Sequence, residues 1–293
     1  MSSDSMVNPI NAHKKGDKPL VLAHRGLVTE FQENTLSAVK GAMESKKCDG
    51  CEFDVFLTKD NKVVLFHDES LERVTGVDRS IYDMTWKELQ TLTVQKSIEV
   101  DGGMRHYEKE ERIPLLSDVL EEIKGKDFFV DIEMKAYAPR WTKRRTGREV
   151  AKIVRATGIE DQVVCSSFNF FMLNHLENEH RSIYSGFAYD DVIPLSCKWI
   201  NWFMERNLVG RFINSNIAVV EYTLIDEDSI AKYHKKNMGV GTYTLFPLTP
   251  LGKEHEKYDH YANEVKRLTK LGVDWIETDD PQKVYDLIYE NQS

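Results

Sequence analysis

A regular alternation of short apolar runs with helical patterns is the feature that most constrains the fold of this chain. Eight runs of four to seven mostly apolar residues indicate β-strands, at 20–23, 51–56, 128–134, 163–166, 183–188, 217–223, 240–245 and 275–278. Helical patterns lie between most of them, at 34–45, 147–157, 170–180, 198–208, 227–236, 255–271 and 281–290. Strands that alternate with helices predict a parallel sheet, and eight strands close a (β/α)8 TIM barrel. We therefore expect an α/β chain with a TIM barrel, and an open doubly wound sheet is the structural alternative.

Two of the helical patterns begin at residues that suit a helix N-terminus. Asn34 precedes the first pattern, and asparagine is a favoured N-cap because its side chain accepts a hydrogen bond from the first turn. Pro281 follows Asp279 and Asp280, and proline suits the first turn because an N–H would stay unpaired there. We expect helices to start at both places.

Two segments depart from the alternation. Residues 1–17 are mostly polar and are expected to form a flexible N-terminal arm, so that the barrel comprises residues 18–293. Residues 61–114 lie between the second and third barrel strands and contain a short strand at 63–66, a helix at 85–92 and a polar stretch at 95–112. Loops that follow barrel strands usually have about 2–6 residues. We therefore predict a small insertion over the carboxyl ends of the strands, where the active sites of barrels lie.

The charge and hydropathy of the chain exclude several classes of function. It has 39 basic and 48 acidic side chains, which give a net charge of −9 and argue against a nucleic-acid partner, because that affinity comes mainly from basic residues. No apolar run approaches the roughly 18–20 residues of a membrane span. The first 17 residues also lack the apolar stretch of a signal peptide. We expect a cytoplasmic location.

Two of the predicted strands carry charged residues on one face. Side chains alternate along a strand, so Glu52 and Asp54 share a face, as do Asp131, Glu133 and Lys135. Helices cover the outside of a barrel, so these charges are expected to point inward, where an isolated carboxylate is costly. Three of the carboxylates, Glu52, Asp54 and Glu133, form a set suited to Mg²⁺ or Ca²⁺. The alternative is a set of solvated or salt-bridged charges at strand ends.

Two histidines follow predicted strands. His24 precedes Arg25 at the end of the first strand, and His67 follows the short strand of the insertion. Imidazole titrates near neutrality and suits general acid–base catalysis. Arg25 and Lys135 could hold a phosphate group. Taken alone, each histidine is better explained by an ordinary capping or packing role.

Several short motifs follow one another closely in the first part of the chain. They are His24-Arg25-Gly26, Glu33-Asn34-Thr35, Glu52-Phe53-Asp54-Val55 with Thr58-Lys59-Asp60, and His67-Asp68 with Leu71 and Arg73. Later segments are Arg112-Ile113-Pro114-Leu115-Leu116, Ile132-Glu133-Met134-Lys135, Ser166-Ser167-Phe168-Asn169 and Thr278-Asp279-Asp280-Pro281. In order and spacing, these motifs resemble the glycerophosphodiester phosphodiesterase family, over about residues 19–290.

The resemblance implies a (β/α)8 barrel that binds one divalent cation, Mg²⁺ or Ca²⁺. The site residues that it implies are Glu52, Asp54 and Glu133 as metal ligands, His24 and His67 as the acid–base pair, Arg25 and Lys135 at the phosphate, and Glu33 in support of Arg25. It also implies hydrolysis of a small-molecule glycerophosphodiester to glycerol 3-phosphate and an alcohol through a cyclic phosphate. Which histidine acts first as the base stays open.

Two positions depart from the family pattern. Gln32 stands where the family usually has proline before Glu-Asn-Thr, and Tyr243-Thr244-Leu245-Phe246 lacks the asparagine that often ends the seventh strand. The second departure bears on substrate detail. The alternatives are a lysophospholipase D or another phospholipid phosphodiesterase, and a barrel that binds a phosphodiester without catalysis.

A basic segment follows the third barrel strand. Residues 135–155 contain eight basic residues and one acidic residue. Part of it, residues 140–155, is a candidate contact for an anionic head group or membrane surface. A solvated helix face is the favoured interpretation, because runs of charge usually have that role.

Overall fold

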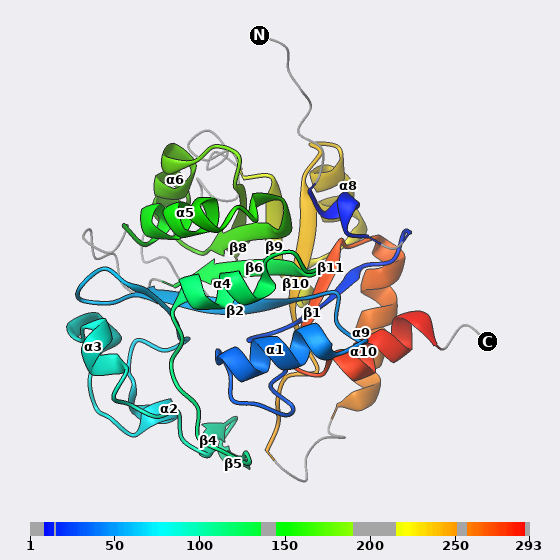
Figure 1. The fold of residues 1–293 in the computed structure, drawn as a ribbon. Helices are drawn as coiled ribbons and strands as arrows, with labels where there is room; N and C mark the ends of the chain where they lie inside the picture. The colour runs from blue at the N-terminus through cyan, green and yellow to red at the C-terminus, as the bar shows by residue number, and fades with distance from the viewer. Residues whose placement is uncertain (1–8, 15, 136–144, 190–214, 251–256, 291–293) are drawn as a thin grey trace, which may run out of the picture.

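The chain forms a closed barrel of eight parallel strands (Figure 1). The computed structural model describes residues 9–14, 16–135, 145–189, 215–250 and 257–290. The barrel strands are β1 (Leu20–Ala23), β2 (Gly50–Leu57), β6 (Phe129–Met134), β7 (Val163–Ser167), β8 (Tyr184–Tyr189), β9 (Ile217–Glu221), β10 (Gly239–Leu245) and β11 (Trp275–Thr278). β1 pairs with both β11 and β2, which closes the sheet. The predicted TIM barrel and all eight predicted strands are confirmed.

Helices follow the barrel strands and cover the outside of the barrel (Figure 1). Among the described residues they are α1 (Leu36–Glu44), α4 (Leu116–Ile123), α5 (Arg145–Thr157), α6 (Phe170–Glu179), α8 (Glu227–His234), α9 (Tyr258–Leu271) and α10 (Pro281–Tyr289). The pattern predicted at 198–208 lies outside the described residues. α4 has no counterpart among the predicted helices, although its buried residues have the i, i+3, i+4, i+7 spacing of an amphipathic helix. No described helix combines the length and hydropathy needed to span a membrane.

The two predicted helix starts have different outcomes. Asp280 caps α10 and Pro281 occupies its first turn, as predicted. Asn34 is not the N-cap of α1, because Thr35 accepts the capping hydrogen bond from the Ala38 amide. Asn34 instead has a positive φ of 57°, and its side chain forms hydrogen bonds with Asp54 of β2.

Large apolar side chains fill the end of the barrel at which the strands begin. Trp275 from β11 lies against Gly241 of β10, where a Cβ atom would come within 2.0 Å of the indole. Ile10 belongs to the same buried cluster and is fully buried. It lies on a short 3₁₀ helix, Pro9–Ala12. The prediction of a flexible arm is therefore wrong for residues 9–14, because Ile10 packs in the barrel and Lys14 forms an ion pair with Asp274.

We expect Ile10→Ala to destabilise the protein by about 2–5 kcal/mol, because the substitution leaves a cavity in a packed cluster. Ile10→Val keeps most of the side chain and should cost only about 0.5–1.5 kcal/mol. Urea unfolding of both variants measures the difference. A free energy of unfolding for Ile10→Ala equal to that of the wild type would contradict the packing of this segment.

The insertion forms a small layered unit at one side of the barrel (Figure 1). It comprises β3 (Val63–Leu65), which is antiparallel to β2, then α2 (Glu72–Thr75), a 3₁₀ turn (Ile81–Asp83), α3 (Trp86–Leu89) and a hairpin of β4 (Ser97–Val100) and β5 (Gly103–His106). It has its own apolar cluster, which includes Leu71, Ile81, Leu89 and Ile98. The polar stretch predicted as a loop is therefore partly a hairpin.

The insertion is fastened to loops at the mouth of the barrel. Arg105 donates hydrogen bonds to the carbonyl oxygens of Thr29 and Thr249. The Tyr107 hydroxyl donates to the Val28 carbonyl oxygen. Gln32, one of the two departures from the family pattern noted above, donates to the carbonyl oxygens of Gln95 and Lys109. These bonds hold the insertion over the carboxyl ends of the strands, as the sequence predicted.

Candidate active site

Three carboxylates from two neighbouring strands lie close together. Glu52 and Asp54 lie on β2 and Glu133 lies on β6, with Asp54 directly opposite Glu133 in the strand register. One carboxylate oxygen from each residue lies within 4.8 Å of the others. Glu52 and Asp54 are buried. The structure thus brings together Glu52, Asp54 and Glu133, the three carboxylates grouped from the sequence as a candidate cation site.

The Glu52 carboxylate is only partly satisfied by the described residues. Its Oε2 accepts a hydrogen bond from the Arg25 amide at 2.9 Å, whereas its buried Oε1 has no hydrogen-bond partner among them. Burial, and then the nearby Asp54 charge, raise the pKa of Glu52 well above its usual value. An added positive charge would stabilise the carboxylate form. The donor set therefore fits a hard divalent cation.

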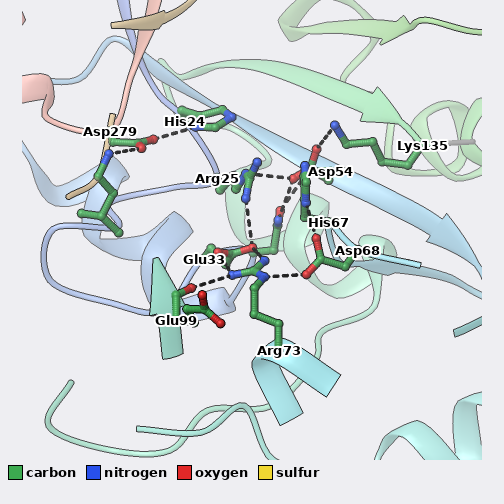
Figure 2. A network of polar contacts seen from close by, with 12 residues as sticks. His24, Arg25, Glu33, Asp54, His67, Asp68, Arg73, Glu99, Lys135 and Asp279 are labelled. Atoms are coloured by element: carbon green, nitrogen blue, oxygen red, sulfur yellow. Dashed lines mark hydrogen bonds and ion pairs between the residues drawn. The ribbon is translucent and has the colours of Figure 1, made fainter. Parts of the chain in front are cut away.

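Lys135 lies beside Asp54 (Figure 2) and also contacts Glu133. Its Nζ lies 3.0 Å from Asp54 Oδ1 and 2.7 Å from Glu133 Oε1. Burial alone would raise the pKa of Asp54, but Lys135, together with His67 and Arg25, holds that pKa well below its usual value. Asp54 therefore stays ionised.

His24 is held by an aspartate from the far end of the chain. Its Nδ1 donates to Asp279 Oδ1 at 2.6 Å, and Asp279 Oδ2 accepts from the Leu248 amide. This leaves Nε2 of His24 on the side of the carboxylate cluster, 3.8 Å from Glu52 Oε2. None of the site roles predicted from the sequence falls on Asp279.

His67 forms a second pair of the same kind. Its Nδ1 donates to Asp68 Oδ1 at 2.6 Å, and Asp68 Oδ2 accepts from Arg73 Nε at 2.6 Å. Burial would raise the pKa of Asp68, but the hydrogen bonds from His67 and Arg73 hold it well below its usual value. Both candidate acid–base histidines thus have one ring nitrogen fixed by a carboxylate, which orients the ring.

Arg25 lies in a tight turn directly after β1. Its φ is +57° and that of Gly26 is +84°, and a Cβ on Gly26 would come within 2.7 Å of Ala38. The turn points the Arg25 guanidinium toward Glu33, which accepts from Nη1 at 3.1 Å, and toward Asp54, 3.4 Å from Nε. Backbone strain of this kind is common where a residue is held for function.

Asn34 fixes the loop that carries Arg25 and Glu33. Its amide nitrogen Nδ2 donates to Asp54 Oδ2 at 2.8 Å, and its Oδ1 accepts from the Asp54 backbone N–H at 2.9 Å. The Asn34 backbone N–H donates to the Arg25 carbonyl oxygen. The residue expected to cap a helix therefore joins the loop to the carboxylate cluster.

A pocket of about 360 Å³ opens beside the two histidines. Its walls come from the ends of β1 and β11, the segment after β10, and the insertion. The lining residues are His24, Arg25, Val28, Glu33, His67, Asp68, Arg73, Glu99, Val100, Asp101, Thr244, Pro247, Leu248 and Asp279. The insertion therefore supplies one wall of the candidate site.

Two further acids lie inside the barrel. Asp131 and Glu277 are buried. Burial raises the pKa of Asp131 to about 8. Burial and then Asp131 raise the pKa of Glu277 well above its usual value, and its Oε1 accepts from Trp275 Nε1. Among the described residues, neither belongs to the group of carboxylates placed to bind a metal ion, Glu52, Asp54 and Glu133.

Comparison with known proteins gives a consistent result. The model of the glycerophosphoryl diester phosphodiesterase family matches residues 24–283. A glycerophosphodiester phosphodiesterase of Caldanaerobacter subterraneus subsp. tengcongensis is 33% identical over 274 residues, which cover 92% of this chain and 98% of that protein. A lysophospholipase D of Mus musculus is 33% identical over 280 residues, which cover 91% and 85%.

A solved structure shares the fold. It is an Oleispira antarctica phosphodiesterase in complex with the product sn-glycerol-3-phosphate. It superposes with a TM-score of 0.69 at 22% identity, over 92% of this chain and 97% of that chain. At this identity the likeness concerns the barrel architecture.

Proposed function

This chain belongs to the glycerophosphoryl diester phosphodiesterase family, and from this membership we propose that it hydrolyses glycerophosphodiesters to sn-glycerol 3-phosphate and an alcohol. Family membership makes the protein a phosphoric diester hydrolase. The observation that carries the proposal for the site is the meeting of three carboxylates with two carboxylate-oriented histidines at one barrel mouth.

In this proposal, Glu52, Asp54 and Glu133 hold one divalent cation, Mg²⁺ or Ca²⁺. Such a cation, when bound, supplies Lewis-acid stabilisation to the oxygens of the phosphodiester. Arg25 and Lys135 lie beside the cluster and supply positive charge to the same group. Glu33 holds the Arg25 guanidinium through its Nη1. These residues bind and orient the phosphodiester.

The two histidines move protons through their Nε2 atoms, since each Nδ1 is already bonded to an aspartate. One histidine accepts the proton of the glycerol hydroxyl adjacent to the phosphate, and that oxygen attacks phosphorus. The other donates a proton to the departing alcohol as its bond to phosphorus breaks. The cyclic phosphate is then opened by water, with the two roles exchanged. The order of the histidines stays open.

A lysophospholipase D activity is the second candidate. It is favoured by the relative from Mus musculus, which is named as such at 33% identity. The same residues would cleave the same type of bond in a lysophospholipid. The two substrates differ in the hydrocarbon chain that a lysophospholipid carries on its glycerol. That chain takes no part in the bonds that form and break at phosphorus.

Product analysis tests the two candidates against each other. Glycerophosphocholine and lysophosphatidylcholine are supplied separately with a divalent cation, and the products are separated by mass spectrometry. We expect glycerol 3-phosphate from the first substrate at the higher kcat/KM. A higher kcat/KM for release of lysophosphatidic acid from the second would favour the lysophospholipase D, and the absence of both products would contradict the proposal.

Two further predictions remain proposals. Residues 140–155 are a candidate for contact with an anionic surface; of these, residues 140–144 lie outside the described part. In the described part, α5 buries Val150, Ala151 and Val154, and Arg148 pairs with Glu179. The cytoplasmic location likewise stays a prediction.

A further inference from the structure

We propose that Arg73 is a positioning residue that holds His67 and Arg25 in one fixed arrangement through a single guanidinium. This inference rests on the function proposed above and extends its site into the insertion. Arg73 lies on α2, outside the barrel strands. None of the roles assigned above from the sequence falls on it.

The contacts of Arg73 run to two carboxylates that each hold a different site residue (Figure 2). Its Nε donates to Asp68 Oδ2 at 2.6 Å, and the other oxygen of Asp68 accepts from His67 Nδ1. Its Nη2 and Nη1 donate to the two oxygens of Glu33 at 2.6 and 2.9 Å. A single carboxylate, that of Asp68, thus connects Arg73 to His67, and a second one, that of Glu33, connects Arg73 to Arg25.

The Glu33 carboxylate is shared between two guanidinium groups. Its Oε1 accepts from both Arg73 Nη2 and Arg25 Nη1, and Glu33 is buried. Burial would raise the pKa of Glu33, but Arg25 and Arg73 lower it. Without Arg73, the whole charge of Glu33 would bear on Arg25 and compete with a bound phosphate for it. The predicted consequence is weaker substrate binding.

The Asp68 carboxylate depends on Arg73 in a different way. Oδ1 accepts from His67 and Oδ2 accepts from Arg73, and the two bonds together fix the rotation of the carboxylate. Without Arg73, Asp68 can rotate, and the ring of His67 loses its fixed direction. Small misplacements of a reacting group can cost about 10²-fold in rate. The predicted consequence here is a lower kcat.

The shape of a guanidinium suits both connections at once. Arg73 uses three nitrogens in one plane to reach two carboxylates, and the fork geometry of arginine suits such pairing. The single nitrogen of a lysine ammonium keeps the charge but cannot reproduce these three separately placed contacts. Arg73→Lys therefore separates the charge of this residue from its geometry.

The test measures kcat and KM with glycerophosphocholine for Arg73→Gln and Arg73→Lys. We expect Arg73→Gln to lower kcat by about 10- to 10²-fold and to raise KM. Arg73→Lys keeps the charge without the fork and should recover only part of the two losses. The control is Arg79→Gln, which removes an exposed arginine of the same insertion, paired with Glu88, and should leave both constants unchanged.

Double variants test whether Arg73 acts through its two partners. In an Asp68→Asn background, Arg73→Gln should lower kcat by much less than in the wild type; in a Glu33→Gln background, it should raise KM by much less. A full and independent effect of Arg73→Gln in both backgrounds would overturn the proposal. So would wild-type kcat and KM in Arg73→Gln.

A spectroscopic readout keeps this test separate from that of the function. The Nδ1 proton of His67, hydrogen-bonded to Asp68, should give a downfield ¹H resonance that is absent in His67→Gln. We expect Arg73→Gln to shift or broaden it, and Arg79→Gln to leave it unchanged. This signal needs no turnover, so a wild type without activity would contradict the proposed function alone. An unchanged resonance in Arg73→Gln would overturn the positioning role.

Discussion

Replacement of either His24 or His67 by alanine is expected to lower kcat for glycerophosphodiester hydrolysis by at least about 10²-fold, the scale of a positioned acid–base group. Both side chains lie at the barrel mouth, 16% and 21% exposed, and outside the apolar clusters. The variants should therefore stay folded. Steady-state kinetics with glycerophosphocholine, with circular dichroism as the check on folding, measure the effect.

His106→Ala is the matched control. His106 lies on the exposed hairpin of the insertion, where its Nδ1 bonds to the Ser97 hydroxyl, and it does not line the pocket. Its replacement should leave kcat within about twofold of the wild type, as is usual for surface substitutions. Near-normal turnover in both His24→Ala and His67→Ala would contradict the assignment of the acid–base pair.

The same two variants assign the two roles. A substrate that releases p-nitrophenol needs little proton donation to its leaving group. The variant that lacks the general acid should therefore recover much of its rate on that substrate, and the variant that lacks the base should not. Equal recovery of both variants would show that neither histidine has a distinct role in departure of the alcohol.

Glu52→Gln is expected to abolish stabilisation of the protein by divalent cations. Glu52 supplies a buried oxygen that no described residue satisfies, and the amide removes its negative charge with little change of shape. At 100 times its Kd, a cation that binds only the folded wild type adds about 2.7 kcal/mol to the free energy of unfolding. Thermal unfolding with Mg²⁺, with Ca²⁺ and with chelator measures this as a change in Tm.

Glu99→Gln is the control for general charge effects. Glu99 lines the same pocket but lies outside the carboxylate cluster. We expect its Tm to rise with the cation as the wild-type Tm does. A Tm of Glu52→Gln that rises as much as that of the wild type would place the cation elsewhere or exclude it.

The carboxylate cluster could be predicted from sequence because two local rules suffice. Alternation along β2 puts Glu52 and Asp54 on one face, and the helices outside the barrel require that face to point inward. The strand order then places Glu133 opposite Asp54. The strands themselves were found because each is a short apolar run between helical patterns.

The partners that hold the histidines could not be found in this way. Asp279 is 255 residues from His24 in the sequence, and only closure of the barrel brings β11 beside β1. Arg73 meets Glu33 across 40 residues, through the irregular path of the insertion. No periodicity encodes such contacts, although Asp68 and Arg73 both fell within motifs of the resembling family.

Local patterns gave the wrong expectation at two places. Asparagine and threonine are both good N-caps, and Asn34 was the residue expected to cap α1. Its side chain instead bonds to Asp54, a tertiary contact that no local pattern encodes, and Thr35 is the cap. The polar composition of residues 1–17 concealed a single buried anchor, Ile10. In both cases packing against distant strands decided the outcome.

The most direct test of the account is release of sn-glycerol 3-phosphate from glycerophosphocholine by the wild-type protein. It is measured with Mg²⁺, with Ca²⁺ and with excess chelator, and repeated with Glu52→Ala. We expect release that requires a divalent cation, stops with chelator and is lost in the variant. Release that persists in the presence of chelator and in Glu52→Ala would contradict the proposed metal-dependent hydrolysis.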